Sequence, residues 1–442
     1  MLNRQNYAAI ENEEVQDRQD PVDTDLLQAT TPGYGTRHIL EAAMNIVNAT
    51  VGAGVIGLPY ALSLAGFSYG IVLSILVGLL TFNALCLMVM AGKRVGIYNF
   101  ADMADYSMGR FGYHTLNLTL FIQSAGSCVS YFILVADTIP ILFGLYFPEY
   151  RLLADRQLVT ILVSVFVIFP LNLSRSIGAL ARWSIVSVLL LPVMLISVLI
   201  RAPAYAPDHH APLFSSGKDF LGALGIMCFA FVCTQVAFSN FLSQRNQSMT
   251  GWSWTAAIST VVSWLTSMGF AAIGYLSFGT DVDSNIFNNF PVDDNVINIG
   301  RLALGLSMVL TVPMAFYPAR DAVQKTLGFE KGHRQPSTLE HHVVTVILFA
   351  AFLMLGIYIR SLGRVYSVVG GLASSFVAYI APGASYLAVF RPTWLRKSVS
   401  NGEDEALLGK SPESTWWRDA CSVFLILFGI LIMICTLISA FR

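Results

Sequence analysis

The sequence predicts an all-α polytopic membrane protein with about eleven transmembrane helices: two inverted repeats of five helices, each beginning with a broken helix, plus one extra helix. Three observations carry this prediction. The 442 residues are 55% hydrophobic and only 12% charged. Apolar runs recur along most of the chain, each close to the roughly 20 residues that a spanning helix needs. The first and sixth runs are interrupted by glycine or polar residues.

Charged and Pro/Gly-rich breaks divide the chain into its expected parts. Residues 1–36 are polar and acidic and are expected to form a disordered cytosolic tail. Residues 37–390 form the expected inverted-repeat core, 391–417 a cytosolic loop and 418–442 the final helix. The expected spans are 38–65, 67–92, 114–137, 157–174, 183–200, 219–242, 254–278, 296–318, 341–359, 364–389 and 419–440.

The distribution of charge predicts the orientation. Eighteen of the 26 lysine and arginine residues fall in the segments that share a side with the N-terminus. By the positive-inside rule this side is cytosolic, and eleven spans then place the C-terminus on the other side. The net charge is −1, so nothing favours a nucleic-acid partner, and the lipid bilayer is the expected surroundings.

The first span carries the most informative segment, N-I-V-N-A-T-V-G-A-G-V-I-G-L-P-Y, from Asn45 to Tyr60. Three glycines and a proline lie inside a helix that must cross the membrane. Unwound backbone at that depth is tolerated where it lines a cavity and binds an ion or a substrate. The segment therefore indicates a secondary transporter. Close packing of two helices through small residues is the alternative explanation of the glycines.

The sixth span supplies the matching break expected five spans later. The run F-A-F-V-C-T-Q-V-A-F-S-N, from Phe229 to Asn240, places four polar residues in an apolar helix but contains no glycine. A continuous helix with polar residues facing the bundle is the alternative. Two repeats of five spans and one extra span account for eleven.

A substrate site is expected where the two breaks meet. A helix that restarts at mid-membrane presents free N–H groups and the positive end of its dipole, which suit an α-carboxylate. The expected binding residues are Gly52, Ala53 and Gly54 for the carboxylate and Phe229, Cys233 and Thr234 for the amino group, with Thr50 beside them in the first break.

A cation site is expected beside the first break. Thr311 lies in L-T-V-P, where Pro313 removes a backbone hydrogen bond and frees a carbonyl about one turn earlier. Asn48, Val51, Met308 and Thr311 could form an all-oxygen site, with sodium held between Asn48 and Thr311. A purely structural threonine before a proline is the alternative.

Two further features concern gating and sorting. Arg37 and Asp321 both lie on the expected cytosolic side and could form an inner gate, or only a solvated ion pair.

Two leucine pairs that follow acidic residues, Leu26 with Leu27 and Leu407 with Leu408, are similar to signals read by sorting adaptors. The expected outer loops contain no N-x-S/T sequon, which slightly favours a vacuolar, lysosomal or other internal membrane over the plasma membrane.

These motifs, with G-Y-L-S-F from Gly274 and Y-P-A-R from Tyr317, resemble the amino acid/auxin permease family. The sodium-coupled neutral amino acid transporter branch is the most similar, with related vacuolar transporters. The resemblance implies a LeuT-like fold, and it implies that Asn48 and Thr311 serve the cation site. Many members of the branch carry histidine after F-V-C, where this chain has Thr234, so the resemblance leaves the substrate preference open.

The function expected from the sequence is transport of amino acids, neutral ones above all, coupled to sodium by alternating access. The chain is not expected to be an enzyme and needs no cofactor, with Na⁺ or H⁺ as coupling ion. A proton-coupled vacuolar or lysosomal exporter and an amino acid sensor with little transport are the alternatives.

Overall fold

The computed structural model describes residues 32–173, 177–329, 336–391 and 416–440, and the described chain is entirely helical apart from its loops. The expected acidic tail and cytosolic loop lie almost wholly outside these ranges. Nine described helices are long and apolar enough to cross a membrane, and a bent pair, Ile39–Thr50 with Gly54–Ala65, makes a tenth span. The shorter apolar segment Arg156–Asn172 lies where the fourth span is expected, and we number it span 4; whether it crosses the membrane stays a prediction.

The helices of the first five spans follow the chain in order. Span 1 comprises α2 (Ile39–Thr50), the 3-10 turn η1 (Ala53–Gly57) and α3 (Leu58–Ala65); span 2 is α4 (Phe67–Val95) and span 3 is α5 (Phe100–Tyr146). Span 4 joins α6 (Arg156–Val163), the π-helical turn η3 (Ser164–Ile168) and α7 (Phe169–Asn172), and span 5 is α8 (Ile177–Arg201).

Span 6 opens the second half with α9 (Phe220–Phe231), η5 (Thr234–Val236) and α10 (Ala237–Ser243). Spans 7, 8 and 9 are α11 (Met249–Phe278), α12 (Asn295–Thr326) and α13 (Thr338–Tyr358). Span 10 comprises α14 (Leu362–Val369), the π-helical turns η8 (Gly370–Ser374) and η9 (Phe376–Ile380), and α15 (Ala381–Phe390); α18 (Trp416–Ala440) is the final span. Short 3-10 turns in the connecting loops are η2 (Arg151–Ala154), η4 (Ala202–Asp208), η6 (Gly279–Asp281) and η7 (Ile286–Asn289).

Both expected breaks are present. Span 1 bends by 57°, because Val51 and Gly52 leave the helical conformation (ψ 81° and −151°) before the chain restarts as a 3-10 turn. Span 6 leaves the helix at Val232 (ψ 121°) and Cys233 (φ −146°). The polar residues of F-V-C-T-Q thus mark a true interruption and not a continuous helix.

The third span differs from its expected start. Instead of beginning near residue 114, α5 begins at Phe100 behind an Asn99 cap and is kinked at Gly109, where φ is 66°. That left-handed conformation favours glycine because a side chain there would meet the backbone. The polar segment before the kink therefore forms a separate helical arm, which a hydropathy count assigns to a loop.

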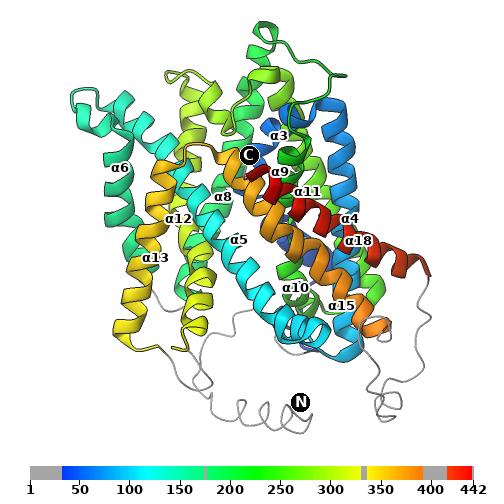
Figure 1. The fold of residues 1–442 in the computed structure, drawn as a ribbon. Coiled ribbons are helices and arrows are strands. Elements are labelled where there is room, and N and C mark those ends of the chain that lie inside the picture. Colours follow the sequence, from blue (N-terminus) through cyan, green and yellow to red (C-terminus); the bar gives the residue numbers. More distant parts are fainter. Residues whose placement is uncertain (1–31, 174–176, 330–335, 392–415, 441–442) are drawn as a thin grey trace, which may run out of the picture.

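The helices pack in two groups. In one, α12 lies against α5 and α8, and α13 lies against α5; in the other, α11 packs on α4, α2 and α3, and α9 packs on α3 and α14. Figure 1 shows α6 and α13 at one side of the bundle and α4 and α18 at the other. We call the end where α2 begins and α4 ends the inner end, and the opposite end the outer end.

Backbone pairing ties span 1 to span 6 at both ends. At the inner end, Arg37 N–H donates to Ser243 O (2.9 Å) and Arg245 N–H donates to Arg37 O (2.9 Å). At the outer end, Gly217 N–H donates to Ala65 O (3.0 Å) and Asp219 N–H donates to Leu64 O (3.0 Å). In each case the segment that precedes one broken span pairs with the end of the other, as an inverted repeat requires.

Candidate functional site

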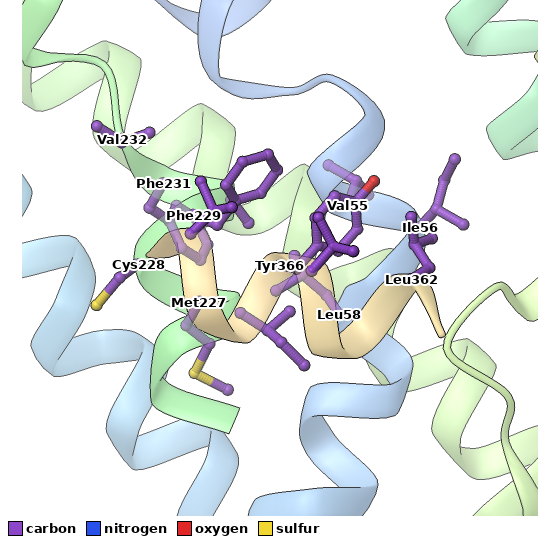
Figure 2. Close-up of a cluster of buried hydrophobic side chains, with 14 of the residues drawn as sticks. Val55, Ile56, Leu58, Met227, Cys228, Phe229, Phe231, Val232, Leu362 and Tyr366 are labelled. Atoms are coloured by element: carbon purple, nitrogen blue, oxygen red, sulfur yellow. The ribbon is translucent and has the colours of Figure 1, made fainter. Parts of the chain in front are cut away.

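The restart of span 1 packs directly against span 6. A Cβ placed on Gly54 would lie 3.0 Å from Ala230 Cα and 3.5 Å from Phe229 Cδ1, so only glycine fits this approach without movement. Phe229 in turn stacks on Tyr366 of α14, with ring centroids 4.5 Å apart. Figure 2 shows Val55 and Leu58, Phe229 and Tyr366 reaching the same cluster from three segments. The apolar side of the candidate site is therefore a rigid contact between spans 1, 6 and 10.

Polar groups of the two breaks also meet. The Thr50 hydroxyl donates to Ile46 O (2.8 Å) and lies within hydrogen-bond reach of the Cys233 thiol. The next residue, Thr234, donates its hydroxyl to Val377 O (2.8 Å) in the π-helical turn η9. Thr234, the position that departs from the family pattern, thus holds the span 6 break against span 10.

Gly52 differs from Gly54 because it faces open space. A Cβ placed on Gly52 would meet no atom within 4 Å, and its backbone is extended (φ −127°, ψ −151°). Directly after it, Ala53 and Gly54 occupy the start of the η1–α3 helix, where the first N–H groups have no acceptor in their own helix. This is the geometry in which backbone N–H groups can receive a carboxylate.

The expected cation ligands come from two helices that no described hydrogen bond joins. Asn48 is exposed on α2, and Val51 is the buried residue that ends that helix. Met308 is buried in α12, and the Thr311 hydroxyl donates to Ser307 O at 2.7 Å. Whether these residues bind a cation stays a prediction.

Thr311 belongs to a cluster of three hydroxyls, with Ser187 and Ser307. Ser187 of α8 lies within hydrogen-bond distance of both Thr311 Oγ1 (2.5 Å) and Ser307 Oγ (2.9 Å), and the Ser307 hydroxyl reaches Ser187 O at 3.1 Å. Ser307 could have been found from the sequence, since it lies one helical turn before Thr311 on the same face. Ser187 could not, because only the packing of α8 on α12 brings it there.

The inner halves of the two broken spans are joined by a side-chain hydrogen bond. Asn45 Nδ2 donates to Asn240 Oδ1 at 2.7 Å, and Asn240 Nδ2 donates to Val236 O at 2.8 Å. Asn240 is only 3% exposed. Together with the pairing of Arg37 described above, this contact fixes α2 to α10.

The expected gate residues are apart. Asp321 pairs with Lys325 one turn later (2.8 Å), and Arg37 is held through its backbone. The neighbouring Arg320 donates to Asn172 O (2.6 Å), which ties α12 to span 4. One stripe of α2, with Leu40 60% and Met44 48% exposed and Asn48 following, is not covered by protein.

Three arginines bind loops and helix ends at the outer end. Arg301 of α12 is 1% exposed and donates to the carbonyls of Phe287 (2.9 Å) and Phe290 (2.7 Å), which holds the α11–α12 loop on the bundle. Arg156 pairs with Asp137 at 3.1 Å and donates to Ile357 O, and Arg201 pairs with Asp294 at 2.7 Å.

The chemistry of the site fits a small solute and a hard cation. Within the described ranges, no three His, Cys, Asp or Glu side chains could hold a metal together. The groups available near the breaks are instead hydroxyls, amides and backbone carbonyls and N–H groups. Oxygen donors of this kind suit alkali and alkaline-earth ions better than transition metals.

Comparison with known proteins finds amino acid transporters. A family model described as "Transmembrane amino acid transporter protein" matches residues 35–403. The "Putative sodium-coupled neutral amino acid transporter 11" of Bos taurus is 30% identical over 355 residues, covering 78% of this chain and 75% of that protein. The "Vacuolar amino acid transporter 2" of Saccharomyces cerevisiae is 28% identical over 359 residues, covering 77% of this chain and 74% of that protein.

A solved structure supports the fold. The crystal structure of MhsT in complex with L-phenylalanine superposes with a TM-score of 0.51, at 13% identity, over 92% of this chain and 99% of that one. At this identity the likeness concerns the fold alone. The all-helical bundle with its two broken spans is therefore a LeuT-like fold with an added final helix, as the sequence predicts.

Proposed function

Because this chain belongs to the transmembrane amino acid transporter family, we propose that it moves neutral amino acids across a membrane by alternating access, coupled to sodium. The observation that carries this proposal is the meeting of two broken helices at mid-membrane, with open space beside Gly52 and hydroxyls nearby. The relatives are named as transporters and not as enzymes, in agreement with the expectation that the chain is not an enzyme.

The substrate rests between the breaks. Its α-carboxylate accepts hydrogen bonds from the N–H groups at Ala53 and Gly54, with Gly52 leaving the space, and its amino group meets Thr50 and the carbonyls around Cys233. Phe229 closes the apolar side, because its ring is fixed by Tyr366. Thr234 does not bind the substrate with its side chain, because its hydroxyl donates to Val377 O; it holds the span 6 break in place instead.

Sodium is the co-transported ion and lies between α2 and α12, with Asn48, Val51, Met308 and Thr311 as its ligands. In the geometry described above, the Thr311 hydroxyl is shared with Ser307 and Ser187. The three hydroxyls thus satisfy one another in the absence of a cation. Binding of sodium replaces the contact between Thr311 and Ser187, and α2 moves toward α12 to complete the site.

The inner gate closes along the uncovered stripe of α2. When α2 approaches α12, the side chains of Leu40, Met44 and Asn48 become covered by α12. Arg37 then comes within reach of Asp321, and the Asp321 carboxylate pairs with Arg37 in place of Lys325. The rigid contact between α2 and α10 means that the inner halves of spans 1 and 6 move together.

The proposed location is a vacuolar, lysosomal or other internal membrane, with the N-terminus in the cytosol. A vacuolar relative and the absence of sequons in the outer loops support this location. Leu26, Leu27, Leu407 and Leu408 are the proposed adaptor signals and lie outside the described residues. Replacing all four with alanine should move a tagged protein toward the cell surface; an unchanged distribution would remove the signals from the account.

Two alternatives remain testable beside this proposal. A proton-coupled exporter would accumulate amino acids with a pH gradient and without sodium, and a sensor would bind amino acids without accumulating them. Uptake of a panel of labelled amino acids into proteoliposomes, with imposed sodium or proton gradients, separates the three. The proposal requires sodium-driven uptake of at least one neutral amino acid.

A further inference from the structure

Two hollows lie beside α18 on the surface of the bundle, and nothing in the transport site uses them; together we call them the groove. The inner hollow, of about 430 Å³, is lined mainly by α11, with Ser253 and Trp254 among its residues, and also by Met90 of α4 and Arg418 of α18. The second hollow, of about 250 Å³, lies between Leu80 and Asn83 of α4 and Cys421 and Phe424 of α18, further from the inner end on both helices. Figure 1 shows α18 lying obliquely across α15 toward α4 at the edge of the bundle.

Faces of three helices line the groove. On α4 the lining positions are 80, 83 and 90, on α18 they are 418, 420, 421, 424 and 425, and α11 adds 249, 250, 253, 254 and 257 at the inner hollow. Helices α4 and α18 run in opposite directions. Arg418 therefore faces the inner end of α4, with its Nη1 3.6 Å from Met90 Sδ, and the apolar residues of both helices follow toward the middle of the membrane.

Within the described residues, the charge of Arg418 has no acidic partner. In the part of the chain that the structure describes, no carboxylate lies within ion-pair distance of Arg418, and its contacts are the Met90 sulfur and the Trp417 ring, 5.0 Å away. The adjacent carboxylate, Asp419, is bound by Arg391 at 2.8 Å. An arginine in this position can pair with a phosphate.

The indole rings around the groove place its mouth at the membrane surface. Trp254 is 62% exposed and lines the inner hollow together with Arg418. Trp417 is 45% exposed and directly precedes Arg418 in the sequence. Tryptophan concentrates at the level of the lipid headgroups. The mouth lies at the inner end, which the positive-inside rule assigns to the cytosolic leaflet, where anionic lipids concentrate.

We propose that this groove binds one anionic glycerophospholipid of the cytosolic leaflet, with its phosphate on Arg418 and an acyl chain along the Leu80–Phe424 hollow. The hydroxyl of Ser253 and the Trp254 ring flank the headgroup. The lipid fills the gap between the final helix and the transporter core, and so fastens α18 to α4. This site is separate from the amino acid site and does not depend on the coupling ion.

The test is lipid retention measured by native mass spectrometry. The full-length protein is taken from bilayers of phosphatidylcholine with phosphatidylserine, and the phosphatidylserine that remains bound is counted. Arg418→Gln should lower retention about fivefold, the factor that one cation near an anionic surface contributes. Arg110→Gln is the matched control, because Arg110 is exposed at the inner end but outside the groove. Equal retention by the parent and Arg418→Gln would overturn the proposal.

A second variant tests the apolar half. Cys421→Phe fills the deeper hollow and leaves Arg418 in place, so it should also lower retention, with an unfolding temperature in pure phosphatidylcholine like that of the parent. Full lipid retention by Cys421→Phe would mean that Arg418 binds the lipid without the deeper hollow, and it would overturn the proposed binding site for the acyl chain. Millimolar inorganic phosphate should not displace the lipid; displacement would identify a free-anion site instead.

Discussion

Asn45 in the first broken helix donates a hydrogen bond to Asn240 in the second, with 2.7 Å between Nδ2 and Oδ1. The two residues lie in the inner halves of spans 1 and 6 and are 195 positions apart in the sequence. Backbone pairing at Arg37 supports the same contact at the inner end, and pairing at Gly217 and Asp219 repeats it at the outer end. Spans 1 and 6 are thus fastened to each other along their length.

The first prediction is that Asn45 and Asn240 act as a unit. Asn45→Ala leaves the buried Asn240 amide without its donor, which costs about 1–3 kcal/mol, and Asn240→Ala leaves the half-buried Asn45 amide without its acceptor, which costs less. Asn45→Ala and Asn240→Ala should each slow amino acid uptake and lower the unfolding temperature, and the double variant should add little. Ser63→Ala is the control, because that hydroxyl bonds only within its own helix. Fully additive effects would show that the two amides are not coupled.

The second prediction concerns the hydroxyl cluster. Thr311→Ala should raise the sodium concentration for half-maximal uptake at least tenfold with little loss of stability, because Ser187 and Ser307 remain paired. Ser187→Ala removes the group that competes with sodium for Thr311, so it should lower that concentration about fivefold, corresponding to one hydrogen bond of about 1 kcal/mol. Sodium activation that is unchanged in Thr311→Ala would remove this threonine from the cation site.

The third prediction separates binding from packing at the glycines. Gly54→Ala would press a methyl group against the backbone of Ala230, at 3.0 Å, and should destabilise the protein by about 1–3 kcal/mol. Gly54→Val would do the same, so loss of transport in that variant reports packing as well as binding. Gly52→Ala meets open space. It should keep the unfolding temperature of the parent and weaken substrate binding.

Isothermal titration with the transported amino acid checks the Gly52 variant. Normal affinity in folded Gly52→Ala would place the carboxylate elsewhere.

The fourth prediction concerns Asp294, which lies in the outer loop ahead of α12. Burial raises the pKa of this carboxyl, but hydrogen bonds from Arg201 and from the N–H groups of Val296 and Ile297 outweigh burial, and the net pKa is lowered. A group with a lowered native pKa stabilises the fold fully above its unfolded value of about 3.9 and loses this effect as the pH falls through the native value.

Asp294→Asn should therefore unfold at a lower temperature than the parent, by the same margin from pH 5 to pH 8. The margin should shrink below about pH 4. The asparagine side chain still accepts hydrogen bonds from the N–H groups at the start of α12. The difference in unfolding temperature between the parent and Asp294→Asn therefore measures the ion pair with Arg201. A margin that vanishes by pH 6 would contradict this assignment.

The sequence was sufficient for the spans and for both breaks, because hydropathy, glycine and proline act locally. Gly52 marks the break of span 1, with Gly54 and Pro59 in the segment that restarts it, and Thr234 and Gln235 mark span 6 because polar residues are costly in an apolar helix. The π-helical turns of spans 4 and 10 left no such mark, since the small, β-branched and aromatic residues that form them also occur in continuous apolar helices.

The partners of the site residues needed the structure. Ser187 is one of several serines in apolar helices, and its meeting with Thr311 depends on how α8 lies on α12. The two glycines Gly52 and Gly54 look alike in the sequence, yet one faces open space and the other packs on Ala230. A difference of this kind follows from tertiary packing, which no local pattern encodes.

The measurement that tests the central claim most directly is accumulation of a labelled neutral amino acid against its own gradient, in proteoliposomes that contain only the purified protein. With an inward sodium gradient and the membrane potential clamped, we predict a transient internal concentration above the external one, abolished by a sodium ionophore and strongly reduced, at the same sodium concentration, in Thr311→Ala. Specific binding of the amino acid without accumulation, under either a sodium or a proton gradient, would contradict the account.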